Sequence, residues 1–313
     1  MLDKIMKDKR GFIQIPFAWL FAIVVGALIL FFAIYASVKL INTEGTVSSA
    51  KTGKEIAVLL NPLETGFGEE TTTPLKIAVE SRIGNNCQVS GDFGEQEIII
   101  SQKSRGEWQR TGTGSVFYNK YIFSNKSVQG KNFYLFSKPF EFPFKVADLI
   151  FLTSAEDNYC FVDPPAEIKE ELTNLNQPNL LVENCPSESI VVCFSEDDGC
   201  DILVKENQRT VDKNGKTLYF ETDALMFGAI FSDPVVYECQ TQRLMKRMEQ
   251  LALIYNEKES IISTKGCYVE GAPNLFPLTA SVSGYRDSSD LAGISNLVDD
   301  VEDENKRAYC GLW

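Results

Sequence analysis

Cysteine is the residue type with the clearest chemical potential in this chain of 313 residues, which has eight cysteines and no histidine. In an oxidising compartment eight thiols can close up to four disulfides, which restrict the unfolded chain. The alternative is a set of buried free thiols, because unpaired cysteine commonly serves as a small core residue. The candidates are Cys87, Cys160, Cys185, Cys193, Cys200, Cys239, Cys267 and Cys310.

Cys193 and Cys200 form the pair that the local sequence favours. They flank the turn-like stretch SEDDG, which lies between two runs rich in β-branched residues. A hairpin there would bring the two cysteines opposite each other, at a separation that a disulfide can span. The pairing of the other cysteines stays open, because spacing alone does not assign it.

The absence of histidine excludes Ser-His-Asp and Cys-His catalysis and every histidine-based metal site. Carboxylates are abundant, with 43 Asp and Glu residues, so neighbouring acids arise without any special role. The acidic pairs Asp197-Asp198 and Asp299-Asp300 lack EF-hand spacing, and we interpret them as solvated turns. We therefore expect no catalytic residue, no metal site and no cofactor.

One sequon of the form N-x-[ST] occurs in the chain, at Asn125-Lys126-Ser127. It lies in a loop-like stretch of the region that we place outside the cell, and glycosylation needs such a surface position. The sequence therefore predicts a glycan on Asn125.

An uncharged and strongly apolar run of 28 residues extends from Gly11 to Val38. As a helix it would span about 42 Å, which exceeds the hydrocarbon core of about 30 Å. It is longer than the apolar region of a cleaved secretory signal, and it lacks the polar stripe of a helix on a soluble core. We predict a transmembrane helix at residues 11–41, after a cytoplasmic basic segment at 1–10.

Basic residues indicate the orientation of this helix. Lys4, Lys7, Lys9 and Arg10 crowd its N-terminal flank, and the positive-inside rule places such a flank in the cytoplasm. Residues 42–313 then lie outside, where all eight cysteines would meet oxidising conditions. We expect a single-pass protein of the cell membrane with an extracytoplasmic C-terminal region.

Beyond the membrane helix the sequence predicts an α+β fold that disulfides stabilise. Residues 42–62 are expected to extend the helix as far as Asn61-Pro62, because a residue before proline avoids the helical region. Short alternating and aromatic runs between Gly, Asn and Pro predict a β-rich exterior domain at 63–165. Residues 166–313 predict an α+β exterior domain, either separate or continuous with the preceding one, with strands paired around Asn214-Gly215.

One long amphipathic helix is expected to start at Asp233-Pro234, a favourable cap and first-turn pair. Apolar residues recur along it at helical spacing, so one face should pack on a sheet. Arg243, Lys246 and Arg247 form a small basic patch, which we interpret as a solvated face of this helix. Because the net charge of the chain is −13, we expect no nucleic-acid partner.

Positive charges, then Gly11, then a long apolar helix form the pattern at the start of the chain, with Gln14, Ile15 and Phe17 close behind the glycine. This pattern resembles the class III signal of type IV pilin-like proteins, especially archaeal ones, and the layout resembles that of archaeal single-pass surface proteins. The resemblance implies cleavage by a prepilin peptidase after Gly11 and assembly through the N-terminal helix. Pro16 departs from it, because the pilin start has an acidic residue there.

Two classes of function are compatible with these features. The first is a non-enzymatic, membrane-anchored extracytoplasmic protein with a structural or interaction role, for example a pilin-like or envelope-assembly subunit that binds protein partners or its own copies. The second is a membrane-tethered extracytoplasmic enzyme, such as a hydrolase that works with two carboxylates and needs no histidine. A deep pocket with two inward carboxylates of raised pKa would favour the enzyme.

Overall fold

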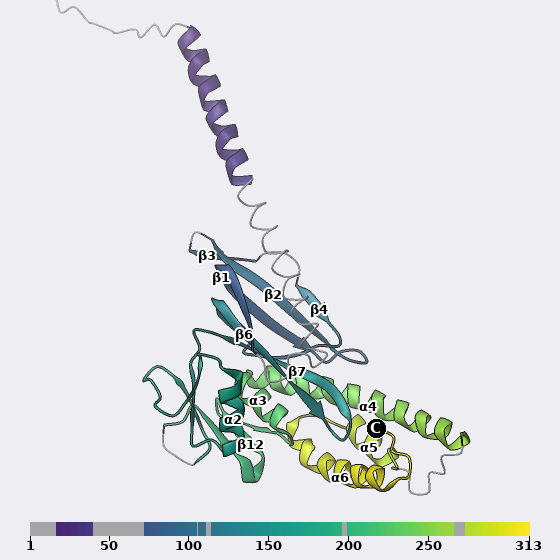
Figure 1. The fold of residues 1–313 in the computed structure, drawn as a ribbon. Coiled ribbons are helices and arrows are strands. Elements are labelled where there is room, and N and C mark those ends of the chain that lie inside the picture. The colour runs from purple at the N-terminus through teal and green to yellow at the C-terminus, as the bar shows by residue number, and fades with distance from the viewer. Residues whose placement is uncertain (1–16, 40–71, 105, 111–113, 196–198, 266–272) are drawn as a thin grey trace, which may run out of the picture. The chain divides into compact units, whose positions relative to one another are not determined.

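The computed structural model describes residues 17–39, 72–104, 106–110, 114–195, 199–265 and 273–313 (Figure 1). The chain divides into two compact units, Met1–Ser48 and Ser49–Trp313. The expected basic segment at 1–10 and the expected helical extension at 42–62 lie outside the described residues. We consider each unit by itself.

The first unit contains a helix of 23 residues, Phe17–Lys39, inside the range where the sequence predicts a membrane span. It would extend about 34 Å at about 1.5 Å per residue. Its aromatic and aliphatic side chains are exposed, among them Phe17, Trp19, Phe31 and Phe32. The helix is long and apolar enough to cross a membrane, and a signal sequence near an N-terminus has the same properties.

The second unit has the α+β architecture that the sequence predicts, and its strands form two sheets. Within the described residues, sheet A has the order β3-β2-β1-β6-β7-β5, with β4 paired to β2. Its pairs are antiparallel except for β5 and β7, which run parallel. The strands are β1 (Thr73–Gln88), β2 (Glu95–Ser104), β3 (Glu107–Arg110), β4 (Ser115–Phe117), β5 (Tyr121–Phe123), β6 (Ser127–Glu141) and β7 (Lys145–Ser154).

Sheet B has the order β13-β12-β11-β10-β8-β9 and mixes both directions. The strands β9, β8, β10 and β11 run parallel to one another, and β12 and β13 complete the sheet as an antiparallel hairpin. The strands are β8 (Tyr159–Val162), β9 (Leu180–Val182), β10 (Ile190–Cys193), β11 (Ile202–Lys205), β12 (Thr210–Lys213) and β13 (Lys216–Tyr219).

Helices α3 and α4 pack against both sheets. Helix α3 contacts β6 and β7 of sheet A and also β12 and β13 of sheet B, while α4 contacts β1, β5 and β7 on one side and β13 on the other. The helices are α2 (Ala166–Leu175), α3 (Asp223–Phe231), α4 (Pro234–Thr264), α5 (Phe276–Ser283) and α6 (Leu291–Arg307), with short 3₁₀ turns η1 (Glu206–Gln208) and η2 (Ser288–Asp290).

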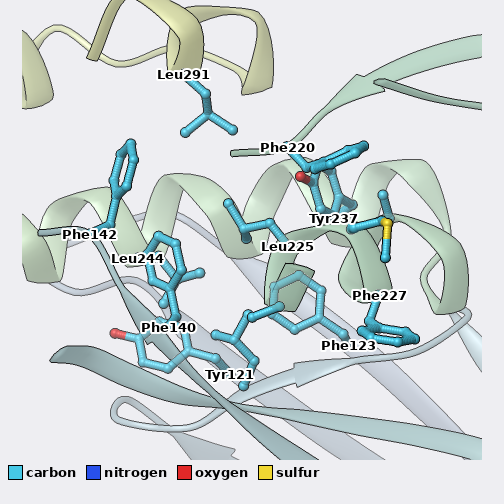
Figure 2. Packing of buried hydrophobic residues seen from close by; sticks show 14 of the residues in the cluster. Tyr121, Phe123, Phe140, Phe142, Phe220, Leu225, Phe227, Tyr237, Leu244 and Leu291 are labelled. Atoms are coloured by element: carbon cyan, nitrogen blue, oxygen red, sulfur yellow. The ribbon is translucent and has the colours of Figure 1, made fainter. Parts of the chain in front are cut away.

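The main core lies around α3 (Figure 2). The ring of Phe231 in α3 contacts rings of both sheets, Phe136 of β6 and Tyr159 of β8, with 5.8 and 5.0 Å between the centroids. Every residue of α3 from Ala224 to Phe231 is buried, as expected for a helix that is apolar all round. Gly228 lets α3 approach β5 closely, because a Cβ atom there would lie 2.9 Å from Cδ1 of Phe123 in β5. Phe123 also packs against Tyr237 of α4, with 6.1 Å between the ring centroids.

Two local predictions about this unit are confirmed. The strands β12 and β13 pair antiparallel around Asn214 and Gly215, whose φ angles of 53° and 71° suit a tight hairpin turn. Helix α4 starts at Pro234, and the side chain of Asp233 accepts a hydrogen bond from the backbone N–H of Val235 at 2.9 Å. Both signals are short-range backbone chemistry, which a sequence displays directly.

The hairpin expected between β10 and β11 is wrong, because these strands are parallel and Cys193 lies beside Leu203. The chain therefore returns to the starting edge of the sheet before β11 begins. Asp201 fixes this return: its backbone N–H donates to the carbonyl of Val191, and its carboxylate accepts from the N–H of Val191 at 2.8 Å. The sequence did not reveal the parallel pairing, because two short β-branched runs separated by a turn are compatible with either parallel or antiparallel strands.

Candidate functional site

Six of the eight cysteines form three disulfides in the described structure. Cys87 in β1 joins Cys239 in α4, Cys160 in β8 joins Cys185, and Cys193 at the end of β10 joins Cys200. Cys310 is also disulfide-bonded, whereas Cys267 lies outside the described residues. Disulfides of this number are characteristic of domains that mature in an oxidising compartment.

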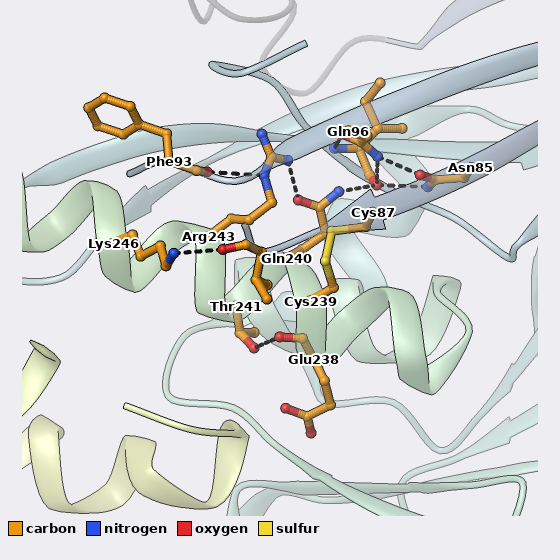
Figure 3. The surroundings of a disulfide bond; sticks show 12 residues. Asn85, Cys87, Phe93, Gln96, Glu238, Cys239, Gln240, Thr241, Arg243 and Lys246 are labelled. Atoms are coloured by element: carbon orange, nitrogen blue, oxygen red, sulfur yellow. Dashed lines mark hydrogen bonds between the residues drawn. A yellow bond between two sulfur atoms is a disulfide. The ribbon is translucent and has the colours of Figure 1, made fainter. Parts of the chain in front are cut away.

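The Cys87–Cys239 disulfide lies beside a buried polar network that attaches α4 to sheet A (Figure 3). Gln240 of α4 donates to the carbonyl of Ile122 at 3.1 Å, and Gln96 of β2 donates to the same carbonyl at 2.8 Å. Asn85 of β1 donates to it as well, at 3.0 Å. Strands β1, β2 and β5 and helix α4 therefore share a single acceptor in the interior.

The interpretation of Arg243 as part of a solvated basic face is wrong, because its side chain is fully buried. Its guanidinium donates five hydrogen bonds and lies 4.8 Å from the ring centroid of Tyr121. Burial lowers its pKa to about 10, which leaves the group charged at neutral pH. The acceptors are the carbonyls of Phe93, Phe117, Tyr118 and Lys120 and the side-chain oxygen of Gln240.

The other two cations of that patch also bind backbone oxygens rather than standing free in solvent. Lys246 donates to the carbonyls of Val89 and Gly91, each at 2.6 Å, and Arg247 donates to the carbonyl of Val146 at 2.7 Å. These two side chains thus hold α4 against the β1–β2 loop and the start of β7. We interpret the patch as structural.

A cavity of about 540 Å³, which we call the edge cavity, opens where the strands of sheet B begin. Tyr159, Ile190 and Ile202 are the first residues of the parallel strands β8, β10 and β11, and Lys213 is the last residue of antiparallel β12. All four strand ends therefore meet at one edge of the sheet. The β5–β6 connection adds Asn125 to the lining.

Buried polar side chains line the edge cavity. Lys213 is 8% exposed, and its ammonium donates to the carbonyl of Ile230 at 2.7 Å and to that of Ser232 at 2.8 Å. Burial lowers the pKa of Lys213 to about 8, although the charge of nearby Asp233 acts in the opposite direction. The hydroxyl of Ser189 is buried and has no hydrogen-bond partner in the described part of the chain.

Asn125, the predicted glycosylation residue, is half-buried beside this cavity. Its side chain forms a hydrogen bond with Tyr159, which lowers the pKa of that phenol, but burial has the larger effect and raises this pKa. Glycosylation of Asn125 stays a prediction.

The carboxyls of raised pKa are not among the residues that line the cavities we describe. Burial is the main cause for Asp157, Glu206 and Glu238, and none of these three lines the edge cavity or a second cavity of about 400 Å³ between β6 and α2. Glu238 instead accepts two hydrogen bonds from Ser288, at 2.8 and 2.6 Å, which tie α4 to η2.

Some residues that the sequence singled out cannot be placed. Gly11 and the pair Asp197-Asp198 lie outside the described residues. Asp299 and Asp300 are exposed on α6, in a helix rather than in the turn that we expected. Neither Asp299 nor Asp300 lines the edge cavity.

Apart from Asn125 and Asn214, which the sequence singled out for other reasons, sequence reasoning missed the residues of the edge cavity. Lys213 ends a strand of four residues and precedes a turn, a position where lysine is normally solvated. Tyr159 and Ser189 belong to no motif, and they meet Lys213 only because parallel strands place distant segments at one edge. The one signal in the sequence that could have located part of the cavity is the hairpin turn at Asn214-Gly215, because it fixes the end of β12 at Lys213.

Comparisons of the chain with protein families, with curated proteins and with solved structures gave no match. Its function must therefore be argued from its own residues.

Proposed function

We propose that this chain is a membrane-anchored extracytoplasmic protein with a structural or interaction role. In this proposal the N-terminal helix stays in the membrane, the basic N-terminus is cytoplasmic, and the disulfide-bonded unit lies on the outer side. The apolar exposed surface of Phe17–Lys39 is the observation that carries it, since none of its most apolar window is buried. Such a surface needs a lipid or protein environment.

The disulfides give independent support for the side of the membrane. Three pairs link β1 to α4, β8 to the segment after β9, and β10 to the start of β11. Cytosolic proteins rarely keep such bonds, because cellular thiols reduce them. The basic flank of the helix predicts the same orientation.

A binding role agrees better than a catalytic one with the described acids. Of the carboxyls whose pKa burial raises, Glu238 binds Ser288, and none of Asp157, Glu206 and Glu238 lines the edge cavity or the cavity between β6 and α2. A hydrolase with two carboxylates would need two such groups facing one substrate. Assembly through the N-terminal helix is the form of this role that the pilin resemblance implies.

Topology can be tested by thiol labelling of intact cells. A membrane-impermeant maleimide should label the full-length protein only after reduction with an external reductant. In the chain that retains Met1, a Lys4→Cys variant serves as the control for the inner side, because the introduced thiol should react with a permeant reagent and resist the impermeant one. Labelling of the introduced thiol from outside, or no labelling of the native cysteines even after reduction, would overturn the proposed orientation. Labelling of the native cysteines without reductant would instead contradict the disulfides.

Retention of the helix needs a separate measurement. Mass spectrometry of protein extracted from membranes should find either Met1 or, after pilin-type processing, Phe12 at the N-terminus. In both cases the helix is present and the protein stays in the alkaline-washed membrane pellet. A mature chain that begins beyond Lys39 and is soluble would show that the helix is a cleaved signal.

A further inference from the structure

We propose that the edge cavity binds a small zwitterion, a molecule of the amino-acid class with one carboxylate and one ammonium group. The carboxylate would lie at the buried end against Lys213, and the ammonium would lie at the rim between Glu188 and Asp201. This inference goes beyond the proposed function, because it assigns a ligand to the second unit. It is also independent of that function, because binding can be measured whichever side of a membrane the protein occupies.

The edge cavity is formed by the strand ends of sheet B and their connecting segments. Three parallel strands start there, and the β12–β13 turn closes one side. Its volume of about 540 Å³ falls within the range of small-molecule sites. Tyr159 is 2% exposed, so its ring offers no open face on which a sugar could stack.

The buried end offers a hydrogen-bond donor with no partner in the described chain. An ammonium has three N–H donors. Two of those on Lys213 bind the carbonyls of Ile230 and Ser232, so the third is left for a ligand. Ser189 adds a buried hydroxyl whose bonding capacity is unused. A carboxylate could satisfy both groups, because it accepts several hydrogen bonds.

The rim has the opposite character. Glu188 and Asp201 line the cavity and are both exposed, and Asp201 uses one oxygen to accept the N–H of Val191 at 2.8 Å. A simple anion would meet these two carboxylates, and a simple cation would leave the Lys213 ammonium without a counter-charge. A molecule with both charges complements the two ends at once.

The lowered pKa of Lys213 is consistent with this arrangement, because burial without a hydrogen-bonded carboxylate disfavours the ammonium. A bound carboxylate would supply the missing negative charge. Ligand binding should therefore raise the pKa of Lys213.

The test uses the purified full-length chain in detergent with its disulfides intact. Each L-amino acid is added singly, and its effect on thermal unfolding is compared with that of the matched deaminated acid and the matched decarboxylated amine. For alanine these partners are propionate and ethylamine. At least one amino acid should raise the unfolding temperature, while its two partners should not.

Two variants and one control locate the effect. In Lys213→Met we expect the Kd of the active amino acid, measured by calorimetry, to rise about 10- to 100-fold, since a charge-assisted hydrogen bond is lost. Glu188→Gln changes an exposed residue and should weaken binding about tenfold without harming the fold. Lys216→Met, on the exposed side of the same hairpin and outside the lining, should leave the Kd unchanged.

Several results would overturn the proposal. No stabilisation by any amino acid excludes a site of this class, and equal stabilisation by propionate or ethylamine shows that only one charge is recognised. If Lys213→Met fails to fold, Glu188→Gln decides: an unchanged Kd in that variant rejects the proposed pose. None of these results bears on the orientation of the membrane helix, so the two proposals fail separately.

Discussion

Removing each disulfide in turn should destabilise the second unit in the order of the loops that they close. The separations are 152 residues for Cys87–Cys239, 25 for Cys160–Cys185 and 7 for Cys193–Cys200. Loop-closure entropy then predicts losses of about 5, about 3.5 and about 2.4 kcal/mol in the free energy of unfolding. Each pair would be replaced by two alanines in the full-length chain.

Urea denaturation in detergent, followed by tryptophan fluorescence, measures these losses. Trp313 is a suitable reporter because it packs against Phe144 in the core, with 5.5 Å between ring centroids. The free energies are compared after extrapolation to zero urea, because loss of a cross-link makes the unfolded chain less compact and so raises the m-value.

Cavity formation acts against the predicted order. Cys160 and Cys193 are buried, so replacing them with alanine adds a cavity cost to the two variants with the shorter loops, whereas Cys87 and Cys239 are only half-buried. Equal losses for the three pairs, or a largest loss for Cys193–Cys200, would refute the reasoning from loop length. In that case native-state contacts around each bond would dominate.

Two further predictions concern the buried cations. Arg243→Met should lower the free energy of unfolding by about 3–5 kcal/mol, because five oxygens lose their donor. The matched control Arg286→Met, at an exposed site, should change it by no more than about 0.5 kcal/mol in the same urea assay. Similar losses in both variants would contradict the buried network. Burial lowers the pKa of Lys213 to about 8 from 10.5, so between these values the unfolded chain binds more protons and the free energy of unfolding rises with pH, by up to about 3 kcal/mol. Urea titrations on both sides of this window should show the rise in the native chain and not in Lys213→Met; a difference between the two proteins that does not vary with pH would contradict it.

Features encoded by neighbouring residues could be predicted from the sequence. The apolar helix, the start of α4 at Asp233-Pro234 and the turn at Asn214-Gly215 each follow from a local preference of the backbone or from length and hydropathy. The α+β class followed in the same way, from alternating runs and one long periodic segment.

Features that depend on distant segments could not. Helix α3 is a run of nine mostly apolar residues, a length at which a buried strand and a buried helix look alike. The parallel pairing of β10 and β11 depends on β8, which supplies the neighbouring strand in register with β10. Arg243 is buried because the β1–β2 loop, the end of β4 and the β4–β5 loop offer it carbonyls, and nothing in its own helix indicates them.

Arg243 and Lys213 show why burial alone does not mark a binding site. Both are cations held by carbonyl and amide oxygens rather than by hydrogen-bonded carboxylates. Arg243 has five N–H donors and makes five hydrogen bonds, so its bonding capacity is exhausted within the fold. Lys213 has three donors and makes two hydrogen bonds within the part of the chain that the structure describes, and it lines a cavity with an acidic rim. Because an unmatched buried donor is costly, the remaining donor of Lys213 is where a ligand carboxylate would gain most.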